Sequence, residues 1–189
     1  RAGLAGTGTN TAALAFGGYA PPGRLAITET WNGTNWTEVA DLNSARNALA
    51  GCGTQTAALA FGGLNPVLTP GPRQAVTELW NGSSWTEVND LNTARSALAG
   101  NGITTAALAF GGTTGSNTGA TEEWNGTNWT EVNDLNVARG GLAASGTTTS
   151  ALGFGGGVPP GNQTEEFNPG VAVGAWSTGG NMNTGRFAL

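Results

Sequence analysis

The stretch Thr56-Ala-Ala-Leu-Ala-Phe61-Gly62-Gly63 decides the fold, because it is one of four copies of a single pattern in the chain. The other copies are Thr11-Ala-Ala-Leu-Ala-Phe16-Gly17-Gly18, Thr105-Ala-Ala-Leu-Ala-Phe110-Gly111-Gly112 and Ser150-Ala-Leu-Gly-Phe154-Gly155-Gly156. The first glycines of successive pairs are 45, 49 and 44 residues apart. The sequence is therefore an array of similar modules.

A module of this length cannot bury its own apolar face, so it must stack on its neighbours. Periods of about 40 to 50 residues with strand-like content indicate β-propeller blades. We therefore expect one repeat domain over 1–189, with approximate repeats 1–45, 46–94, 95–138 and 139–185, and with 186–189 beginning a fifth. Glycine supplies 33 of the 189 residues and only 10% are charged, which favours many tight turns and an all-β chain.

The second repeat shows how one module is built. Short apolar strands are expected over 48–52 and 56–61, and the second of them ends at Gly62-Gly63, where positive φ or close backbone approach is allowed. An alternating strand over 76–80 is followed by Asn81-Gly82, the strongest short hairpin signal, and a fourth strand begins at Trp85. Each module is predicted to be a four-stranded antiparallel sheet.

Charge and residue types exclude several classes of function. All seven cations are Arg, His and Lys are absent, and the net charge is −5, which disfavours nucleic acid and anionic membranes as partners. The longest apolar runs are too short to span a membrane. Without His or Lys there is no histidine base, His-ligated metal or Schiff base. The adjacent acids Glu122-Glu123 and Glu165-Glu166 point to opposite strand faces. We expect no enzyme, cofactor or metal site.

Residues that recur once per repeat are interpreted as structural. Burying a Trp ring contributes about 2 to 3 kcal/mol, so one Trp per repeat suits packing between modules. This packing set is Trp36, Trp85, Trp129 and Trp176. A second set, beside the hairpin, is expected to pack as well, with a sugar-stacking platform as the alternative: Trp31, Trp80, Trp124 and, in the fourth repeat, Phe167.

Recurrent polar residues are expected to tie the modules together. A planar guanidinium suits repeated pairing with a carboxylate. The arginines are Arg46, Arg95, Arg139 and Arg186, and the carboxylates come either from Glu29, Glu78, Glu122 and Glu165 or from Glu38, Glu87 and Glu131. Asp41, Asp90 and Asp134 are predicted to form turns. The single Cys52, in a slot that Asn101 fills in the next repeat, is predicted to be a small packing residue.

The segment between the double glycine and the third strand varies most between repeats, and most of the Pro residues fall there. Equivalent loops of a propeller emerge on one face, so this variation predicts one irregular surface on a uniform scaffold, although loops also tolerate neutral drift. The candidate contact residues are Tyr19, Pro21, Pro22, Arg24, Asn65, Pro66, Pro72, Arg73, Asn117, Pro159 and Asn162. Asn-X-Ser/Thr sequons mostly coincide with Asn-Gly turns, so turn geometry explains them.

The order of these features resembles the kelch repeat. That unit has an apolar strand that ends in a double glycine, a polar-aromatic strand, a spaced Trp that starts the last strand, and an Arg before the next unit. Gly62-Gly63, Trp80, Trp85 and Arg95 follow this order, and the resemblance covers all four repeats. It departs where kelch units often carry a Tyr before the double glycine and this chain has Ala-Leu-Ala-Phe61. The resemblance implies a propeller of four-stranded blades.

Two functions are compatible with these observations. Near-identical, lysine-free kelch-like units look similar to repeat proteins of bacterial surface layers and to phage tail or virion accessory proteins. That similarity implies a non-catalytic structural or adhesive module, extracellular or on a virion, whose loops contact a glycan or a protein. The alternative is an intracellular kelch-type platform for protein–protein interaction. Glycan binding favours the first function and capture of a single protein partner favours the second.

The number of blades in a closed ring is left open. Arg1 begins in mid-motif and no leader precedes it, so we expect a processed chain or a window of a longer protein. Four blades can close as a small ring, form part of a ring of about six to eight, or associate with a second copy to complete one.

Overall fold

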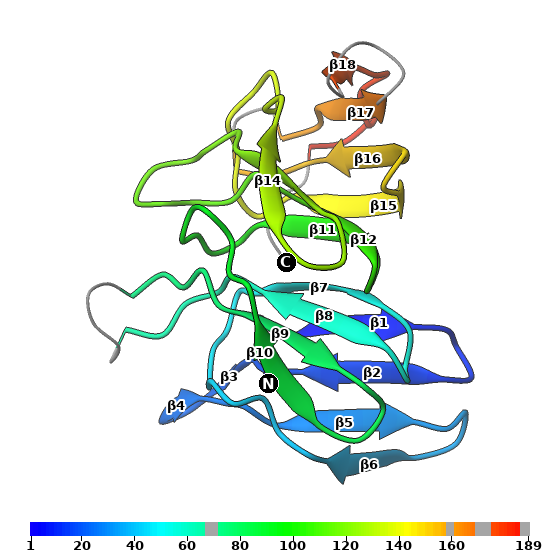
Figure 1. The fold of residues 1–189 in the computed structure, drawn as a ribbon. Helices are drawn as coiled ribbons and strands as arrows, with labels where there is room; N and C mark the ends of the chain where they lie inside the picture. Colours follow the sequence, from blue (N-terminus) through cyan, green and yellow to red (C-terminus); the bar gives the residue numbers. More distant parts are fainter. Residues whose placement is uncertain (67–71, 158–160, 169–174, 186–189) are drawn as a thin grey trace.

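A computed structural model describes residues 1–66, 72–157, 161–168 and 175–185. Within these ranges the chain forms strands, turns and loops and no helix, so the all-β prediction is confirmed. The strands make four four-stranded antiparallel sheets and one two-stranded hairpin (Figure 1).

Each four-stranded sheet takes its strands from one repeat, and we number these units one to four along the chain. The first unit contains β1 (Ala5–Gly8), β2 (Ala13–Phe16), β5 (Thr28–Trp31) and β6 (Trp36–Val39). The second contains β7 (Ala50–Gly53), β8 (Ala58–Phe61), β9 (Thr77–Trp80) and β10 (Trp85–Val88). The third contains β11 (Ala99–Ile103), β12 (Ala106–Phe110), β13 (Thr121–Trp124) and β14 (Trp129–Val132). The fourth contains β15 (Ala143–Thr147), β16 (Ser150–Phe154), β17 (Thr164–Asn168) and β18 (Ala175–Thr178).

The turns within a sheet follow the predicted chemistry. Between β9 and β10, the Asn81 Oδ1 atom accepts hydrogen bonds from the backbone N–H groups of Ser83 and Ser84 at 2.9 and 3.0 Å. Gly82 has a φ of 94°, which disfavours residues with a side chain. Asn32 and Asn125 make the same contacts in their units. The Asn-Gly hairpin prediction is confirmed for the first three units.

The units follow one another in space as they do in sequence (Figure 1). The first strand of each unit contacts the first strand of the next, so that β1 lies by β7, β7 by β11, and β11 by β15. Each sheet has two faces. We call the face that packs on the following unit the forward face, and the face that packs on the preceding unit the backward face.

Apolar clusters fill the junctions between units. Leu59 and Phe61 on a forward face pack with Ala107, Trp124 and Trp129 on the backward face of the next unit. The first and third junctions repeat this arrangement with equivalent residues. The packing role predicted for Trp85, Trp129 and Trp176 is confirmed, because each is buried.

Trp36 departs from this pattern. It occupies the same sequence position as Trp85, yet 48% of its surface is exposed. The physical reason is that the Trp of this set packs against the Phe of the preceding unit, and Trp36 belongs to the first unit. The prediction that all four members of the set are buried is therefore wrong for Trp36.

Buried ion pairs anchor the second, third and fourth units, and they use members of the first of the two carboxylate sets. The guanidinium groups of Arg46, Arg95 and Arg139 lie 2.9 to 3.1 Å from the carboxylates of Glu78, Glu122 and Glu165, respectively. Burial lowers the pKa of these arginines from the ordinary value, and the neighbouring carboxylates oppose that effect. Arg186 lies outside the described residues.

Each buried carboxylate also connects two units. Asn43, at the end of the first unit, donates from its backbone N–H and from Nδ2 to Glu78 Oε2 of the second, at 2.7 and 2.9 Å. Asn92 and Asn136 make the equivalent bonds to Glu122 and Glu165. These bridging asparagines are absent from the sequence-based predictions, although an Asp-Leu-Asn triplet precedes each recurrent Arg of the inner units.

A ladder of backbone hydrogen bonds also joins the units. Gly141 N donates to Ala97 O, Ala97 N to Ala48 O, and Ala48 N to Gly3 O, at 2.7 to 2.8 Å. All these residues have positive φ, and Ala48 and Ala97 are the only described non-glycine residues that do, at 52° and 53°. The ladder therefore holds two alanines in a strained conformation.

Candidate binding surface

The variable loops begin at a fixed point, the double glycine. Gly62 and Gly63 have φ values of 67° and 114°. A Cβ atom on Gly62 would lie 2.8 Å from the carbonyl oxygen of Arg95, and Gly63 N donates to that same oxygen at 2.9 Å. Close approach of the next unit therefore requires glycine here, and it fixes where the loop leaves the sheet.

The bases of three loops have one geometry. A β-bridge joins the residue after the double glycine to the residue after the recurrent Arg, as in Asn47 with Leu64 and Ser96 with Thr113. A second pairing closes each loop, and these pairs are Tyr19 with Arg24, Leu64 with Arg73, and Thr113 with Asn117. Loop length therefore changes between units while the base is kept.

Figure 1 shows where these loops lie in the fold. The hairpin of β3 (Tyr19–Ala20) and β4 (Gly23–Arg24), the chain on either side of residues 67–71, and the loop between β12 and β13 project on the left-hand side. The turns that connect the first two strands of the units lie on the opposite side. We call the side of the variable loops the loop edge.

In the first unit, the loop edge carries an aromatic and cationic pair. The guanidinium carbon of Arg24 lies 5.2 Å from the centroid of the Tyr19 ring, and Arg24 Nε donates to Asn47 Oδ1 at 3.1 Å. Both side chains are half-buried, whereas Pro21 and Pro22, joined by a cis peptide bond, are exposed. The hairpin thus presents a proline tip on a base that is fixed to the second unit.

In the second unit, the predicted residues divide between loop shape and exposed surface. Asn65 is buried, with its N–H donating to Pro72 O at 2.6 Å and its Nδ2 to Ala45 O at 2.7 Å. Pro66 and Pro72 are exposed, and Arg73 is half-buried. Asn65 therefore shapes the loop, while the prolines and Arg73 form its accessible part.

The remaining predicted residues lie in the third and fourth units. Asn117 is exposed, beside a tight turn in which Thr114 N donates to Ser116 O at 3.1 Å. Asn162 is half-buried, and its Nδ2 donates to Met182 O at 3.1 Å. Pro159 lies outside the described residues. The loop edge is thus polar and proline-rich rather than apolar.

Charge distinguishes the loop edge from the scaffold. The four ion pairs found in the described part of the chain involve Arg1, Arg46, Arg95 and Arg139. Arg24 and Arg73 are not among them, so no carboxylate of the described residues neutralises these two half-buried arginines at the loop edge of a chain whose net charge is −5. This arrangement favours contact with a partner that offers hydrogen-bond acceptors or negative charge.

The alternative site, an aromatic platform beside the hairpin, is largely buried. Trp80, Trp124 and Phe167 are 1 to 3% exposed, so their rings are inaccessible for stacking. Trp31 is half-buried, and its indole N–H donates to Asn10 O at 3.0 Å. The packing prediction is confirmed for the three buried rings.

Sequence reasoning missed the residue that follows each recurrent Arg. Asn47 accepts the hydrogen bond from Arg24, and its equivalents Ala2, Ser96 and Gly140 also lie at the bases of the loops. The signal was present, because this position differs in every unit although the Arg before it does not. The residue after each recurrent Arg therefore belongs to the variable surface, on the inner side of the loops.

The described residues, 1–66, 72–157, 161–168 and 175–185, bear on metal ligation and on membrane spanning through their geometry and hydropathy. They include no cluster of three or more His, Cys, Asp or Glu side chains that could hold a metal ion. No helix among them is long and apolar enough to cross a membrane. No known protein-family model and no curated protein matches the chain.

Proposed function

We propose that the chain is a non-catalytic binding module in which kelch-like blades of a β-propeller display variable loops toward a glycan or a protein. The observation that carries this proposal is the loop edge, where loops of different length and composition rise from bases of one geometry. A uniform scaffold with diversity confined to one edge is the arrangement found in recognition proteins.

The propeller part of the proposal is supported by the packing of the units. Successive sheets pack face to face, and their first strands are adjacent. Four-stranded antiparallel sheets arranged radially around inner first strands define propeller blades. The display on a virion or cell surface is proposed from the similarity of the repeats to surface and virion accessory proteins.

The experiment is binding of the whole chain to a glycan array and to candidate host-surface proteins. The test variant replaces residues 65–72 with 114–116, which exchanges one loop for a shorter one between equivalent closing pairs. A second variant, Tyr19→Ser with Arg24→Ser, removes the aromatic and cationic pair. Asn10→Ser, an exposed change in the turn between β1 and β2, is the control at the opposite side.

We expect the loop variants to lose binding while the Asn10 variant keeps it, with all three folded. Binding to a single intracellular protein and to no glycan would favour the interaction-platform alternative. Binding that survives both loop variants would place the contact elsewhere and overturn the assignment to the loop edge.

A further inference from the structure

The junction between units has the same pattern each time it occurs. A Phe on the forward face packs at an angle against a Trp on the backward face of the next unit, with centroids 4.7 to 5.0 Å apart and planes inclined by 57 to 62°. The pairs are Phe16 with Trp85, Phe61 with Trp129, and Phe110 with Trp176. Each of these Trp side chains donates its indole N–H to a buried Thr of the preceding unit at 3.0 to 3.1 Å.

The first unit presents an uncovered backward face. Trp36 is the exposed member of its set, and Trp31 is half-buried where Trp80 is buried. A Cβ atom on Gly51 would clash with the Phe16 ring at 2.4 Å, whereas one on the equivalent Gly6 would meet only Leu14 O. The position that a Phe ring takes at the internal junctions is therefore open at the first unit.

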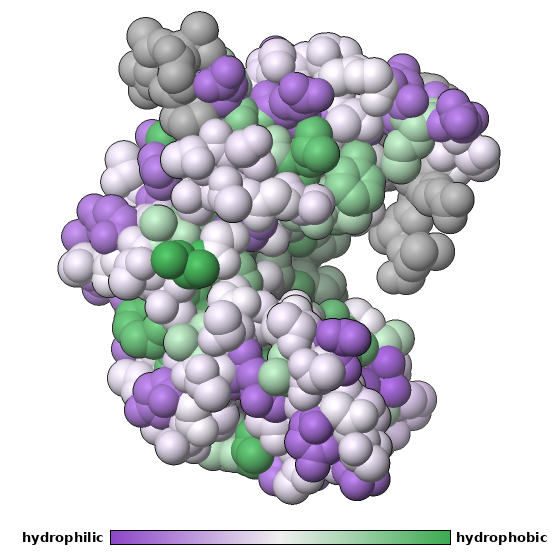
Figure 2. Space-filling view, turned by 90° about the vertical axis from the view of Figure 1, so that its right-hand side faces the viewer, coloured by the Kyte–Doolittle hydropathy of each residue, from purple (hydrophilic) through white to green (hydrophobic). Residues whose placement is uncertain are grey.

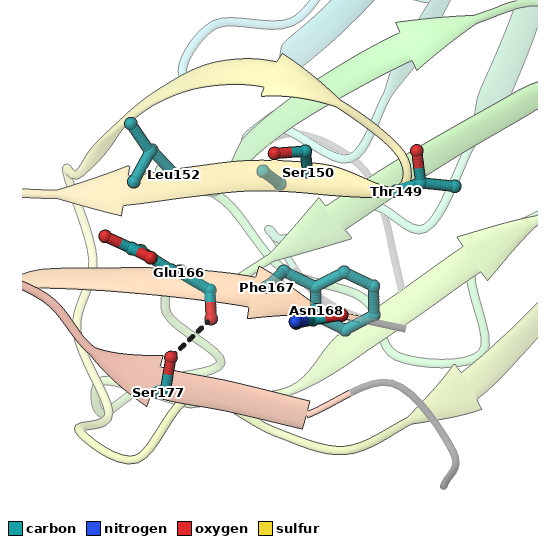
Figure 3. A pocket seen from close by; sticks show the side chains of 8 residues that line it. Thr149, Ser150, Leu152, Glu166, Phe167, Asn168 and Ser177 are labelled. Carbon is teal, nitrogen blue, oxygen red and sulfur yellow. Dashed lines mark hydrogen bonds between the residues drawn. The ribbon is translucent and has the colours of Figure 1, made fainter. Parts of the chain in front are cut away.

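The fourth unit presents an uncovered forward face. Leu152 is 36% exposed, although its equivalents Leu14, Leu59 and Leu108 are buried. Phe154 is only half-buried, and Ala143 is exposed. A shallow pocket of about 390 Å³ lies on this part of the sheet and is lined by Leu152, Glu166 and Ser177, among others (Figure 3).

The polar partners of a junction are uncovered as well. Thr164 is half-buried where its equivalents, which accept the indole N–H, are fully buried. Glu29, in the position of Glu78, has a side chain that is 36% exposed, whereas that of Glu78 is fully buried, and Asn183 holds the sequence position of Asn136. One end of the array therefore offers the Phe, Thr and Asn of a junction, and the other offers the Trp and Glu.

The two ends are separated within one molecule. Figure 2 views the molecule from the right-hand side of Figure 1 and shows a hollow at its right margin, between the upper part, which contains the fourth unit, and the lower part, which contains the first. No apolar cluster of the described residues joins the fourth unit to the first, so the fourth unit can meet the first unit of another molecule.

We propose that two copies of this chain associate head to tail, with the forward face of the fourth unit of one copy packed on the backward face of the first unit of the other. The contacts are those of the internal junctions: Phe154 on Trp36, Trp36 Nε1 to Thr164 Oγ1, and Asn183 to Glu29. The interface is heterologous, because the two faces that meet are different. Two copies close on each other if both junctions form between them, and otherwise further copies can add at the faces left open. The proposal stands independently of the loop edge.

The test measures the solution mass by light scattering over a range of concentrations. Trp36→Glu disables the backward face and leaves the forward face intact, and Leu152→Asp does the reverse. Ile103→Asp, at a position 55% exposed in the third unit, is the matched control for placing an acid on an exposed apolar residue. Thermal unfolding of dilute samples checks that each variant folds as the wild type does.

We expect the wild type and the Ile103 variant to exceed the mass of one chain as concentration rises. Each face variant alone should remain a single chain. An equimolar mixture of the two face variants should give the mass of two chains and no more, because it contains one intact junction and two disabled faces. A wild type that stays monomeric up to its solubility limit, a face variant that associates alone, or a mixture that stays at one chain would overturn the proposal.

Discussion

The rings of Phe61 and Trp129 pack in a T-shaped arrangement with centroids 5.0 Å apart and planes at 62°, although the two residues belong to different units. Neither sheet buries its own ring, so each unit is stabilised by its neighbour. The same sequence position is exposed in the first unit and buried in the third, which gives a matched comparison of the junction's energy.

Trp129→Ala should lower the free energy of unfolding by about 3 to 5 kcal/mol, because it leaves a cavity against Phe61 and removes an indole N–H donor. Trp36→Ala, measured by urea unfolding at low protein concentration, should cost under about 1 kcal/mol, since the side chain is half in solvent. Equal losses for the two variants would contradict the assignment of Trp129 to a junction that Trp36 lacks.

Removing one member of a buried ion pair should be costly. Arg95→Met leaves the Glu122 carboxylate buried without its partner and should lower the free energy of unfolding by about 3 to 5 kcal/mol. Adding Glu122→Gln should recover part of the loss. Arg1→Met, which affects the more exposed pair with Glu29, should cost under about 1 kcal/mol by the same denaturant titration.

Ala97→Gly should stabilise the protein. Ala97 has a φ of 53°, a conformation that costs an L-residue about 1 to 2 kcal/mol and that glycine adopts freely, and Gly3 and Gly141 occupy the same place in the ladder. We expect a gain of about 0.5 to 1 kcal/mol after the higher chain entropy of glycine is subtracted. The control Ala144→Gly, in a strand without positive φ, should instead be destabilising.

The thiol of Cys52 should be inert in the folded protein. It is buried, and burial raises its pKa from 9.0 to about 12. The unfolded chain therefore releases this proton first as pH rises, and stability should fall between about pH 9 and 12. Thiol titration should detect Cys52 only in denaturant, and Cys52→Ala should lack this part of the alkaline decline. Rapid labelling of native protein at pH 8 would disprove the burial argument.

Much of the scaffold was predictable from the sequence because its signals are local and repeated. The Asn-Gly turns, the double glycine and the alternating strands each depend on a few neighbouring residues, so four copies reinforce one interpretation. The choice of carboxylate was not predictable in this way. Glu78 and Glu87 lie directly opposite each other on adjacent strands and share one sheet face, so only the contact with Asn43 and Arg46 distinguishes them.

Other features could not be predicted because they depend on the neighbouring unit. The repeat period predicts a buried Trp both at position 85 and at position 36. Burial of this Trp requires the sheet of a preceding unit, however, and Trp36 lies in the first unit. Among the loop residues, the sequence gives no sign that Asn65 turns inward to Ala45 while Pro66 faces solvent. Loop composition therefore located the variable surface but not the orientation of its side chains.

The ladder that runs from Gly141 through Ala97 and Ala48 to Gly3 uses one donor and one acceptor per step. An in-frame duplication of a whole unit would supply every group that a junction uses. These are the backbone N–H and C=O of the ladder, the aromatic side chains of the junction and the bridging Asn. Lengthening the array by such duplication therefore requires no compensating change elsewhere in the chain. The near identity of the copies is what we expect of a protein that evolves by gain and loss of whole units.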